Sequence, residues 1–239
     1  MYSDYKTPYK CFSLKTGKYV CNKFGLAEFF ARHYCEFEKN SKLRILDVGC
    51  GVMPIGIFLA DLFQCDVTGI DLNPEACRCA ESNANNIGIK ARVKIINTDF
   101  AKFARINERE KYDIIVANPP VDDDVSSEEI ARYAGMSYEN PDDSSYSFLT
   151  NSWHSSEGKD LADYIFEFRD NILKPDGRII LVFCTVDCDS PEYIYKKARL
   201  NGCNIIKVVD ENISAESIGV ESLGLKETHA FMAEFGRRL

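Results

Sequence analysis

The chain has no long apolar run. Spanning a bilayer takes roughly 20 consecutive apolar residues, whereas the longest runs here, such as Ile-Ile-Leu-Val-Phe-Cys at 179–184, have the length of a strand. The first residues, Met-Tyr-Ser-Asp-Tyr-Lys, are too polar for a secretory signal peptide. We therefore expect a cytoplasmic protein with no membrane partner.

Metal-binding and disulfide patterns are also missing. No C-x-x-C repeat occurs among the ten cysteines, and the three histidines are widely separated, at His33, His154 and His229. Zinc sites usually combine such ligands at short spacings, and disulfide scaffolds are small secreted chains. The sequence therefore predicts no metal site and reduced thiols, most of them buried like small apolar side chains.

Neither an internal repeat nor a Gly/Ser-rich linker divides the 239 residues. With 45% hydrophobic and 28% charged residues, the composition is that of a globular protein that buries one large core. We expect one domain over residues 41–239, preceded by an N-terminal extension over residues 1–40. In the extension, residues 21–34 predict an amphipathic helix that packs on the domain or covers a ligand.

Short β-branched apolar runs alternate with amphipathic segments after residue 40. This alternation predicts an α/β fold with a mostly parallel sheet. Seven strands are expected, at 43–48, 66–70, 93–97, 112–117, 178–184, 204–209 and 228–234. Helices are expected at 54–64, 74–87, 159–173 and 191–201, with proline at or near three of the four starts. Gly88 and Gly202 follow two of the helix ends, where glycine commonly stops a helix.

The strand at 43–48 runs into a turn with two glycines and then into a helix start at Pro54. In parallel α/β sheets, ligands bind in the crevice beyond the carboxyl ends of the strands, and glycine lets a ligand approach the backbone closely. Gly49 and Gly51, with Cys50 between them, therefore predict a ligand site. A lone Gly-x-Gly also fits a simple tight turn.

Carboxylates follow the next two strands at the same edge of the sheet. Asp71, followed by Leu72, ends the second strand, where its carboxylate suits the two hydroxyls of a ribose. Asp99 follows the third strand, where it suits an adenine amino group while Phe100 packs on the ring. Each acid alone also fits a simpler role, Asp71 as a helix cap and Asp99 as a turn residue. Together with the glycine turn, they favour a cofactor that contains adenosine.

The fourth strand ends directly in Asn118-Pro119-Pro120. Two prolines stiffen the turn, so the Asn118 amide and the Pro119 carbonyl are held outward. If these two oxygens accept both hydrogens of an NH2 group, the nitrogen lone pair points at an electrophile, and no strong base is needed before attack. The motif therefore predicts chemistry on an amino or amide nitrogen.

In these motifs the chain resembles class I S-adenosylmethionine-dependent methyltransferases, in the branch with an Asn-Pro-Pro-aromatic motif. The resemblance covers roughly residues 41–184. It implies a Rossmann-like seven-stranded sheet of order 3-2-1-4-5-7-6, with the last strand antiparallel and helices on both faces. It also implies catalytic roles for Asn118, Pro119 and Pro120, and cofactor contacts from Asp47, Gly49, Cys50, Gly51, Asp71, Leu72, Asp99, Phe100 and Asn118.

The chain departs from this branch at two positions. Val121 stands where relatives carry an aromatic residue that stacks on a planar target, and Met53 stands where they carry a further glycine. Either the target is not a flat base, or a later aromatic takes the stacking role, from among Tyr133, Tyr138, Tyr146, Phe148 and Trp153. The two departures also leave open a methyltransferase-like subunit without catalytic activity. An NAD-dependent enzyme is a further alternative, although Pro54 replaces the third glycine of that fingerprint.

The segment 121–157 interrupts the alternation and is strongly acidic. Residues 121–160 carry ten acids and two bases, a balance of −8 that equals the net charge of the whole chain. Such a loop repels phosphates, and no basic track for DNA is evident. Charge thus favours an amide or amino nitrogen of a protein side chain or small molecule. An RNA base, at guanine N2 or adenine N6, is the alternative, because acidic loops are often only solvated surface.

Overall fold

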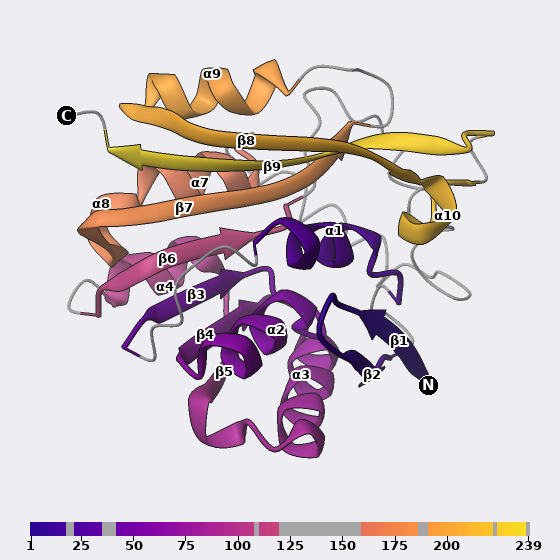
Figure 1. Ribbon diagram of the computed structural model, residues 1–239. Coiled ribbons are helices and arrows are strands. Elements are labelled where there is room, and N and C mark those ends of the chain that lie inside the picture. The colour runs from indigo at the N-terminus through magenta and orange to yellow at the C-terminus, as the bar shows by residue number, and fades with distance from the viewer. Residues whose placement is uncertain are drawn as a thin grey trace.

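The computed structural model describes residues 1–17, 22–34, 42–107, 110–119, 159–185, 191–221 and 224–237. Its centre is a seven-stranded sheet of order β5-β4-β3-β6-β7-β9-β8 (Figure 1). Numbered within the sheet, this is the expected order 3-2-1-4-5-7-6. The strands are β3 (Arg44–Val48), β4 (Asp66–Asp71), β5 (Val93–Asn97), β6 (Tyr112–Ala117), β7 (Leu173–Thr185), β8 (Cys203–Ser214) and β9 (Glu227–Arg237).

The neighbouring strands β5, β4, β3, β6 and β7 are parallel to one another, and β9 is antiparallel to both of its neighbours, β7 and β8. In β3, Ile45 belongs to the core on one face of the sheet, and Leu46 belongs to the core on the other face. Successive side chains of a strand point to opposite faces, so a strand covered on both sides must be apolar at nearly every position. This explains the uninterrupted apolar runs of the central strands.

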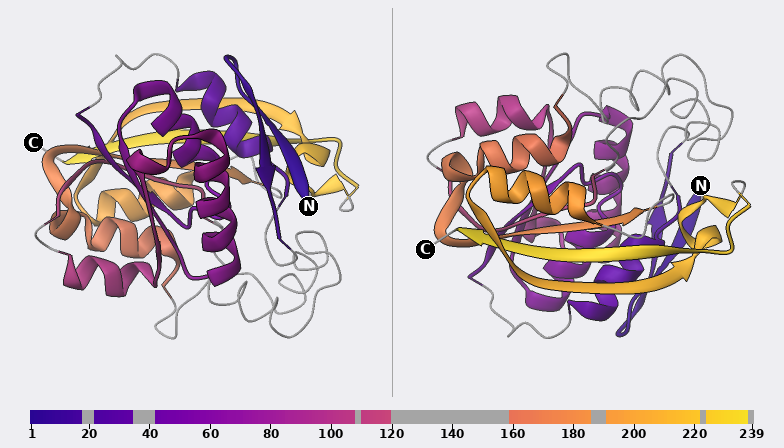
Figure 2. Two further views of the ribbon diagram at one scale, coloured as in Figure 1. Left: turned by 90° about the horizontal axis from the view of Figure 1, so that it is seen from below. Right: turned by 90° about the horizontal axis from the view of Figure 1, so that it is seen from above.

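Helices cover both faces of the sheet (Figure 2). One face carries α1 (Gly25–His33), α2 (Pro54–Phe63) and α3 (Pro74–Ile87). The other face carries α4 (Phe100–Ile106), α7 (Leu161–Glu167), α8 (Arg169–Ile172) and α9 (Glu192–Leu200). Local signals set several ends as expected: Pro54 and Pro74 begin α2 and α3, and Gly88 ends α3 in the left-handed conformation.

The prediction of a single helix at 159–173 is wrong in detail. Two short helices, α7 and α8, occupy this region, and β7 begins already at Leu173. Tyr112 pairs with Leu173, but the next pair joins Ile114 to Arg178, so β7 contains a bulge. A Cβ on Gly177 would lie 2.6 Å from Leu173 Cγ, which explains glycine in the bulge. The sequence analysis also did not predict α4, α10 (Ala215–Ile218) or the 3-10 turn at Lys90–Arg92.

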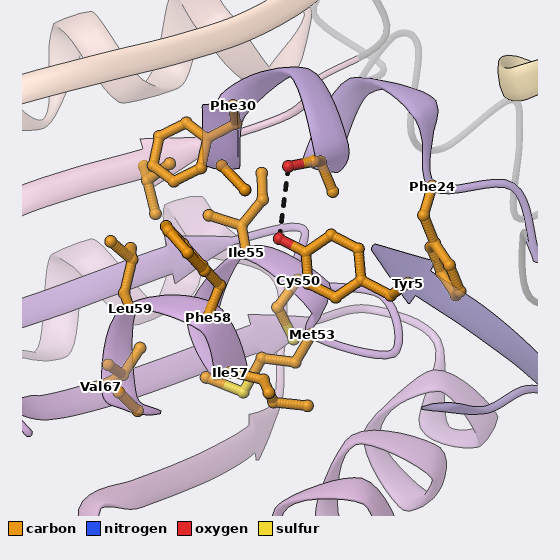
Figure 3. Packing of buried hydrophobic residues seen from close by; sticks show 14 of the residues in the cluster. Tyr5, Phe24, Phe30, Cys50, Met53, Ile55, Ile57, Phe58, Leu59 and Val67 are labelled. Carbon is orange, nitrogen blue, oxygen red and sulfur yellow. Dashed lines mark hydrogen bonds between the residues drawn. The ribbon is translucent and has the colours of Figure 1, made fainter. Parts of the chain in front are cut away.

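The N-terminal extension contains a hairpin that the sequence analysis did not predict. Its strands are β1 (Tyr2–Lys6) and β2 (Cys11–Lys15), paired antiparallel. It is followed by α1, which confirms the helix expected at 21–34. The hydroxyl of buried Tyr5 donates to the Ala27 carbonyl at 3.3 Å, joining hairpin and helix (Figure 3). The extension is therefore packed against the core of the domain.

The described cysteines are free thiols. Most are buried, as expected, but Cys11 is exposed on the hairpin and Cys184 is partly exposed. In the part of the chain that the structure describes, no three His, Cys, Asp or Glu side chains are placed to hold a metal. None of the described helices is long and apolar enough to cross a membrane.

Candidate cofactor and methyl-transfer site

The turn between β3 and α2 has three residues in the left-handed conformation. Gly49 has a φ of +66°, Gly51 of +55° and Met53 of +69°. The turn is closed by a bond of 2.7 Å from the Met53 N–H to the Cys50 carbonyl. A Cβ on Gly51 would meet no described atom within 4 Å, so the turn has an open side. The two glycines thus form a bare backbone surface that a ligand can approach.

Asp47 supports this turn from inside the protein. Its side chain is buried, and Oδ2 accepts a hydrogen bond of 2.9 Å from the Gly56 N–H in the first turn of α2. Burial raises the pKa of Asp47 to about 7; the Gly56 bond opposes this rise, and the nearby Asp71 adds to it. A Cβ on Gly56 would lie 2.8 Å from Asp47 Oδ2, so the glycine makes this approach possible. Asp47 therefore fixes where α2 begins relative to β3.

Asp71 holds the turn from the neighbouring strand. Its Oδ2 accepts the Gly51 N–H and its Oδ1 accepts the Asn73 N–H, both at 2.8 Å. Burial raises the pKa of this carboxyl, and the two backbone bonds oppose that rise. A carboxylate has about four acceptor positions, so two remain for a ligand. Leu72 follows with 41% of its surface exposed at the same edge.

Cys50 lies under the turn. Its side chain is buried, and its N–H donates to the Ile70 carbonyl at 3.0 Å. A Cβ on Gly69 would come within 3.0 Å of Cys50 Sγ, so the thiol points toward β4. Burial and the carboxylates of Asp71 and Asp47 raise the pKa of the thiol well above its usual value. The Cys50 side chain is therefore directed into the protein, and a contact of this residue with the cofactor stays a prediction.

Asp99 and Phe100 lie at the start of α4. Asp99 is exposed, and its Oδ1 accepts the Lys102 N–H at 2.8 Å, so it is the N-cap of the helix. Phe100 is 5% exposed and packs in the core on the α4 side of the sheet. The simpler role of Asp99 as a local cap therefore exists in the structure. Contacts of these two residues with adenine stay a prediction.

Asn118 follows β6 beside the glycine turn. Ala117, the last residue of β6, pairs with Val48, the last residue of β3. The next residues on the two strands are therefore Asn118 and Gly49. Asn118 is exposed and Pro119 is buried, which leaves the amide at the surface of this edge. Pro120, Val121 and the aromatics proposed for stacking lie outside the described residues.

The start of α7 also reaches the turn. A Cβ on Gly49 would lie 3.4 Å from Leu161 Cδ2. The preceding Asp160 caps α7 in a reciprocal bond pair with Asp163, and Lys197 of α9 donates to Asp160 Oδ2 at 2.9 Å and to Asp163 Oδ2 at 2.5 Å. The sequence analysis missed this ion cluster. The Asp-x-x-Asp spacing signals the cap, but Lys197 is 37 residues away from Asp160.

Asn97 is a second residue that the sequence analysis did not assign to the site. From the end of β5, its Nδ2 donates to the carbonyls of Asp71 and Leu72, both at 2.9 Å. These bonds fix the backbone that carries the Asp71 carboxylate. Asn97 is the last residue of its strand and lies two residues before Asp99, and this position could have indicated a role at the site.

The sheet and this edge have the architecture of the class I S-adenosylmethionine-dependent methyltransferase fold. The residues present fit the cofactor: bare glycine backbone at one strand end, and a carboxylate with remaining acceptor positions at the next. The sequence matches the family described as "Methyltransferase domain" over residues 39–233, and the chain belongs to that family. S-adenosylmethionine is thus the cofactor, and the NAD-dependent alternative is not supported.

Curated relatives give a more specific similarity over part of the chain. The tRNA1(Val) (adenine(37)-N6)-methyltransferase of Haemophilus influenzae is 33% identical over 103 residues, which cover 40% of this chain and 44% of that protein. The enzyme of the same name from Yersinia enterocolitica is 39% identical over 79 residues, covering 32% of this chain and 31% of that protein. The chain therefore spans less than half the length of the curated relatives it matches.

Solved structures confirm the fold. The precorrin-6y C5,15-methyltransferase of Geobacter metallireducens superposes with a TM-score of 0.56 at 12% identity, covering 94% of this chain and 93% of that one. Trm5b of Pyrococcus abyssi gives a TM-score of 0.59 at 16% identity, covering all of this chain and 56% of that one. At these identities the likeness concerns the fold alone.

Proposed function

We propose that the protein methylates the N6 amino group of an adenine in RNA, with a tRNA as the favoured class of substrate. The observation that carries this proposal is Asn118, exposed at the end of β6 next to the glycine turn after β3. The partial similarity to tRNA adenine-N6 methyltransferases supports the choice of acceptor. It favours the RNA alternative over the protein or small-molecule substrate that charge alone favoured.

The bound cofactor supplies an electrophilic methyl group on a sulfonium. Asn118 Oδ1 and the Pro119 carbonyl each accept one hydrogen of the adenine NH2, which turns the nitrogen lone pair toward that methyl. Methyl transfer would make the nitrogen positive, and both hydrogen bonds to Asn118 and Pro119 would then strengthen. The extra proton then leaves to water. No titrating base is required of the chain, which matches the absence of histidine from the motif.

We assign the cofactor contacts as follows. Gly49 and Gly51 would pass beneath the methionine part, and Asp71 would accept from the ribose hydroxyls. Leu72 is an exposed apolar side chain that follows Asp71 directly, and it would pack against the adenine ring. Asp99 retains acceptor positions beyond its cap bond, so it can also accept from the adenine amino group while Phe100 supports the ring from the core.

The test is to incubate the protein with methyl-labelled cofactor and with cell lysate separated into RNA, protein and small-molecule pools. We expect label in the RNA pool and, after nuclease digestion, in N6-methyladenosine. Label confined to protein would instead support the alternative that the acidic composition of residues 121–160 favours. Absence of label in every pool, together with normal cofactor binding, would support a non-catalytic subunit.

The matched variant is Asn118→Ala, compared with Asn86→Ala at an exposed asparagine on α3. We expect Asn118→Ala to reduce turnover at least about 100-fold, since it removes a hydrogen bond that strengthens at the developing charge. Cofactor affinity should change less than about threefold, because the amide acts mainly on the acceptor. A near-normal rate on the true substrate would contradict the assignment.

A further inference from the structure

Asn83 on α3 joins two separate parts of the protein. The residue is 1% exposed. Its Oδ1 accepts the Lys15 N–H at 2.6 Å, and its Nδ2 donates to the Lys15 carbonyl at 3.1 Å and to the Val52 carbonyl at 3.2 Å. Lys15 ends the N-terminal hairpin, and Val52 lies in the glycine turn. One buried amide thus binds both the hairpin and the cofactor turn.

The hairpin end is pressed against α3. A Cβ on Gly17 would lie only 2.3 Å from Glu75 Oε1 in the first turn of that helix. The opposite side of the hairpin is attached to α1, where Tyr5 donates to Ala27 and the Lys6 N–H donates to Glu28 Oε1 at 3.0 Å. These attachments to α1 do not involve the glycine turn. Figure 1 shows the hairpin beside α3, at the end of the sheet where the parallel strands finish.

The turn is held from outside by two polar side chains. Asp71 accepts the Gly51 N–H, and Asn83 donates to the carbonyl of the next residue, Val52. Val52 itself lies between two left-handed residues, Gly51 and Met53. Such a turn has few local bonds of its own, so these two side chains, together with the Cys50 N–H bond to the Ile70 carbonyl, hold it in position. Losing the amide would leave the Val52 carbonyl without this donor in a buried place, and the Lys15 carbonyl without it in a partly buried one.

We propose that Asn83 is a positioning residue that couples the N-terminal hairpin to the cofactor turn. Cofactor binding stabilises the turn, and through Asn83 it also holds the hairpin in place. Because such coupling is reciprocal, a docked hairpin raises cofactor affinity by the same factor. The proposal rests on the use of S-adenosylmethionine by the family and on no particular methyl acceptor.

The first test measures binding of S-adenosylmethionine and its demethylated product by calorimetry. Asn83→Ala should weaken binding about tenfold, the effect of roughly one lost buried hydrogen bond. Asn86→Ala on the exposed face of the same helix should leave affinity unchanged. Asn83→Asp keeps the acceptor for Lys15 but loses both donors, so it should bind as weakly as Asn83→Ala. Normal affinity of Asn83→Asp would overturn the coupling to Val52.

The second test follows trypsin cleavage after Lys6, Lys10 and Lys15, with and without cofactor. In the unaltered protein, saturating cofactor should slow cleavage about tenfold, and in Asn83→Ala this slowing should disappear. Tyr5→Phe loosens the hairpin at α1 only, so cleavage should be faster in both states while the slowing by cofactor remains. Thermal melting establishes that each variant is folded.

The result that overturns the proposal needs no variant. If cofactor does not slow cleavage of the hairpin in the unaltered protein, the hairpin and the turn are not coupled. If Asn83→Ala does not fold, the Tyr5→Phe variant still tests the proposal. Cofactor should slow trypsin cleavage of its hairpin, and loss of that slowing would contradict the proposal. Neither measurement requires an RNA substrate, so failure here is distinguishable from failure of the proposed function.

Discussion

The backbone N–H of Gly51 donates to Oδ2 of Asp71 at 2.8 Å, so the carboxylate that ends β4 holds the glycine turn that follows β3. The same carboxylate binds the Asn73 N–H through its other oxygen. One side chain therefore shapes the two adjacent strand ends where the cofactor is expected, and it retains acceptor positions for the ribose.

We predict that Asp71→Ala weakens binding of S-adenosylmethionine by at least about 100-fold, because hydrogen bonds to a charged group contribute roughly 1.5–3 kcal/mol each. The control is Asp66→Ala, an exposed carboxylate at the opposite end of the same strand. Calorimetry should show normal affinity for the control. Comparable affinity of the two variants would remove Asp71 from the cofactor site.

Met53 combines a strained backbone with a buried side chain. It is left-handed like the two glycines before it, yet it is fully buried beside Cys50 and Ile57 (Figure 3). Room for it comes from Gly56 and Gly69, since a Cβ there would lie 2.5 Å and 3.2 Å from Met53 Cε. Met53→Gly should relieve about 1 kcal/mol of strain but lose about 2–5 kcal/mol of packing, a net destabilisation.

Gln64 is the matched control for this prediction. It is also left-handed, with a φ of 55°, but it is exposed at the end of α2. Gln64→Gly should therefore stabilise the protein by up to about 1 kcal/mol. Urea unfolding of both variants measures the two changes. A stabilised Met53→Gly would mean that the side chain contributes little and that strain dominates in this turn.

The raised pKa of Asp47 predicts a pH dependence of stability. The folded protein binds a proton to this carboxyl up to a pH of about 7, whereas the ordinary pKa of an aspartate is 3.8. Between these values the folded state holds more protons, so stability falls as the pH rises and is constant above about 7. Asp47→Asn should remove this decrease, on the order of 2–4 kcal/mol. The measurement is the difference in unfolding free energy between the two proteins at pH 4, 5.5 and 7.5.

Lys197 should matter for the start of α7. Burial raises the pKa of Asp160, and the bonds from the Asp163 N–H and from Lys197 oppose this. Lys197→Met leaves a buried carboxylate without its cation, at a cost of about 3–5 kcal/mol at neutral pH. The exposed neighbour Lys196 provides the control, with an expected change below about 0.5 kcal/mol. Adding Asp160→Asn to Lys197→Met should recover part of the lost unfolding free energy, because the buried charge is then removed. If the two substitutions change the unfolding free energy additively, Lys197 and Asp160 are not paired.

Local patterns predicted the sheet well. The period of the apolar residues located all seven strands, and the proline and glycine positions located several helix ends. The Leu173–Gly177 region was misread as a helix end, because a bulged strand has no regular period. The hairpin of β1 and β2 was also missed. Its strands have five residues each, and so short a strand has too few buried apolar positions to show a clear period.

The sequence by itself determined where the strands lie along the chain, the glycine turn, the carboxylate at Asp71 and the amide at Asn118, whereas the order of the strands was implied by the family resemblance. These features follow from local chemistry: which residues alternate, which permit a left-handed turn, and which stand just after a strand. Only the tertiary structure decided that Asp47 faces Gly56, that Met53 is left-handed and buried, and that Asn83 joins the hairpin to the turn. Each of these depends on residues that are distant in sequence or on a cavity that several elements form together, which no local pattern records.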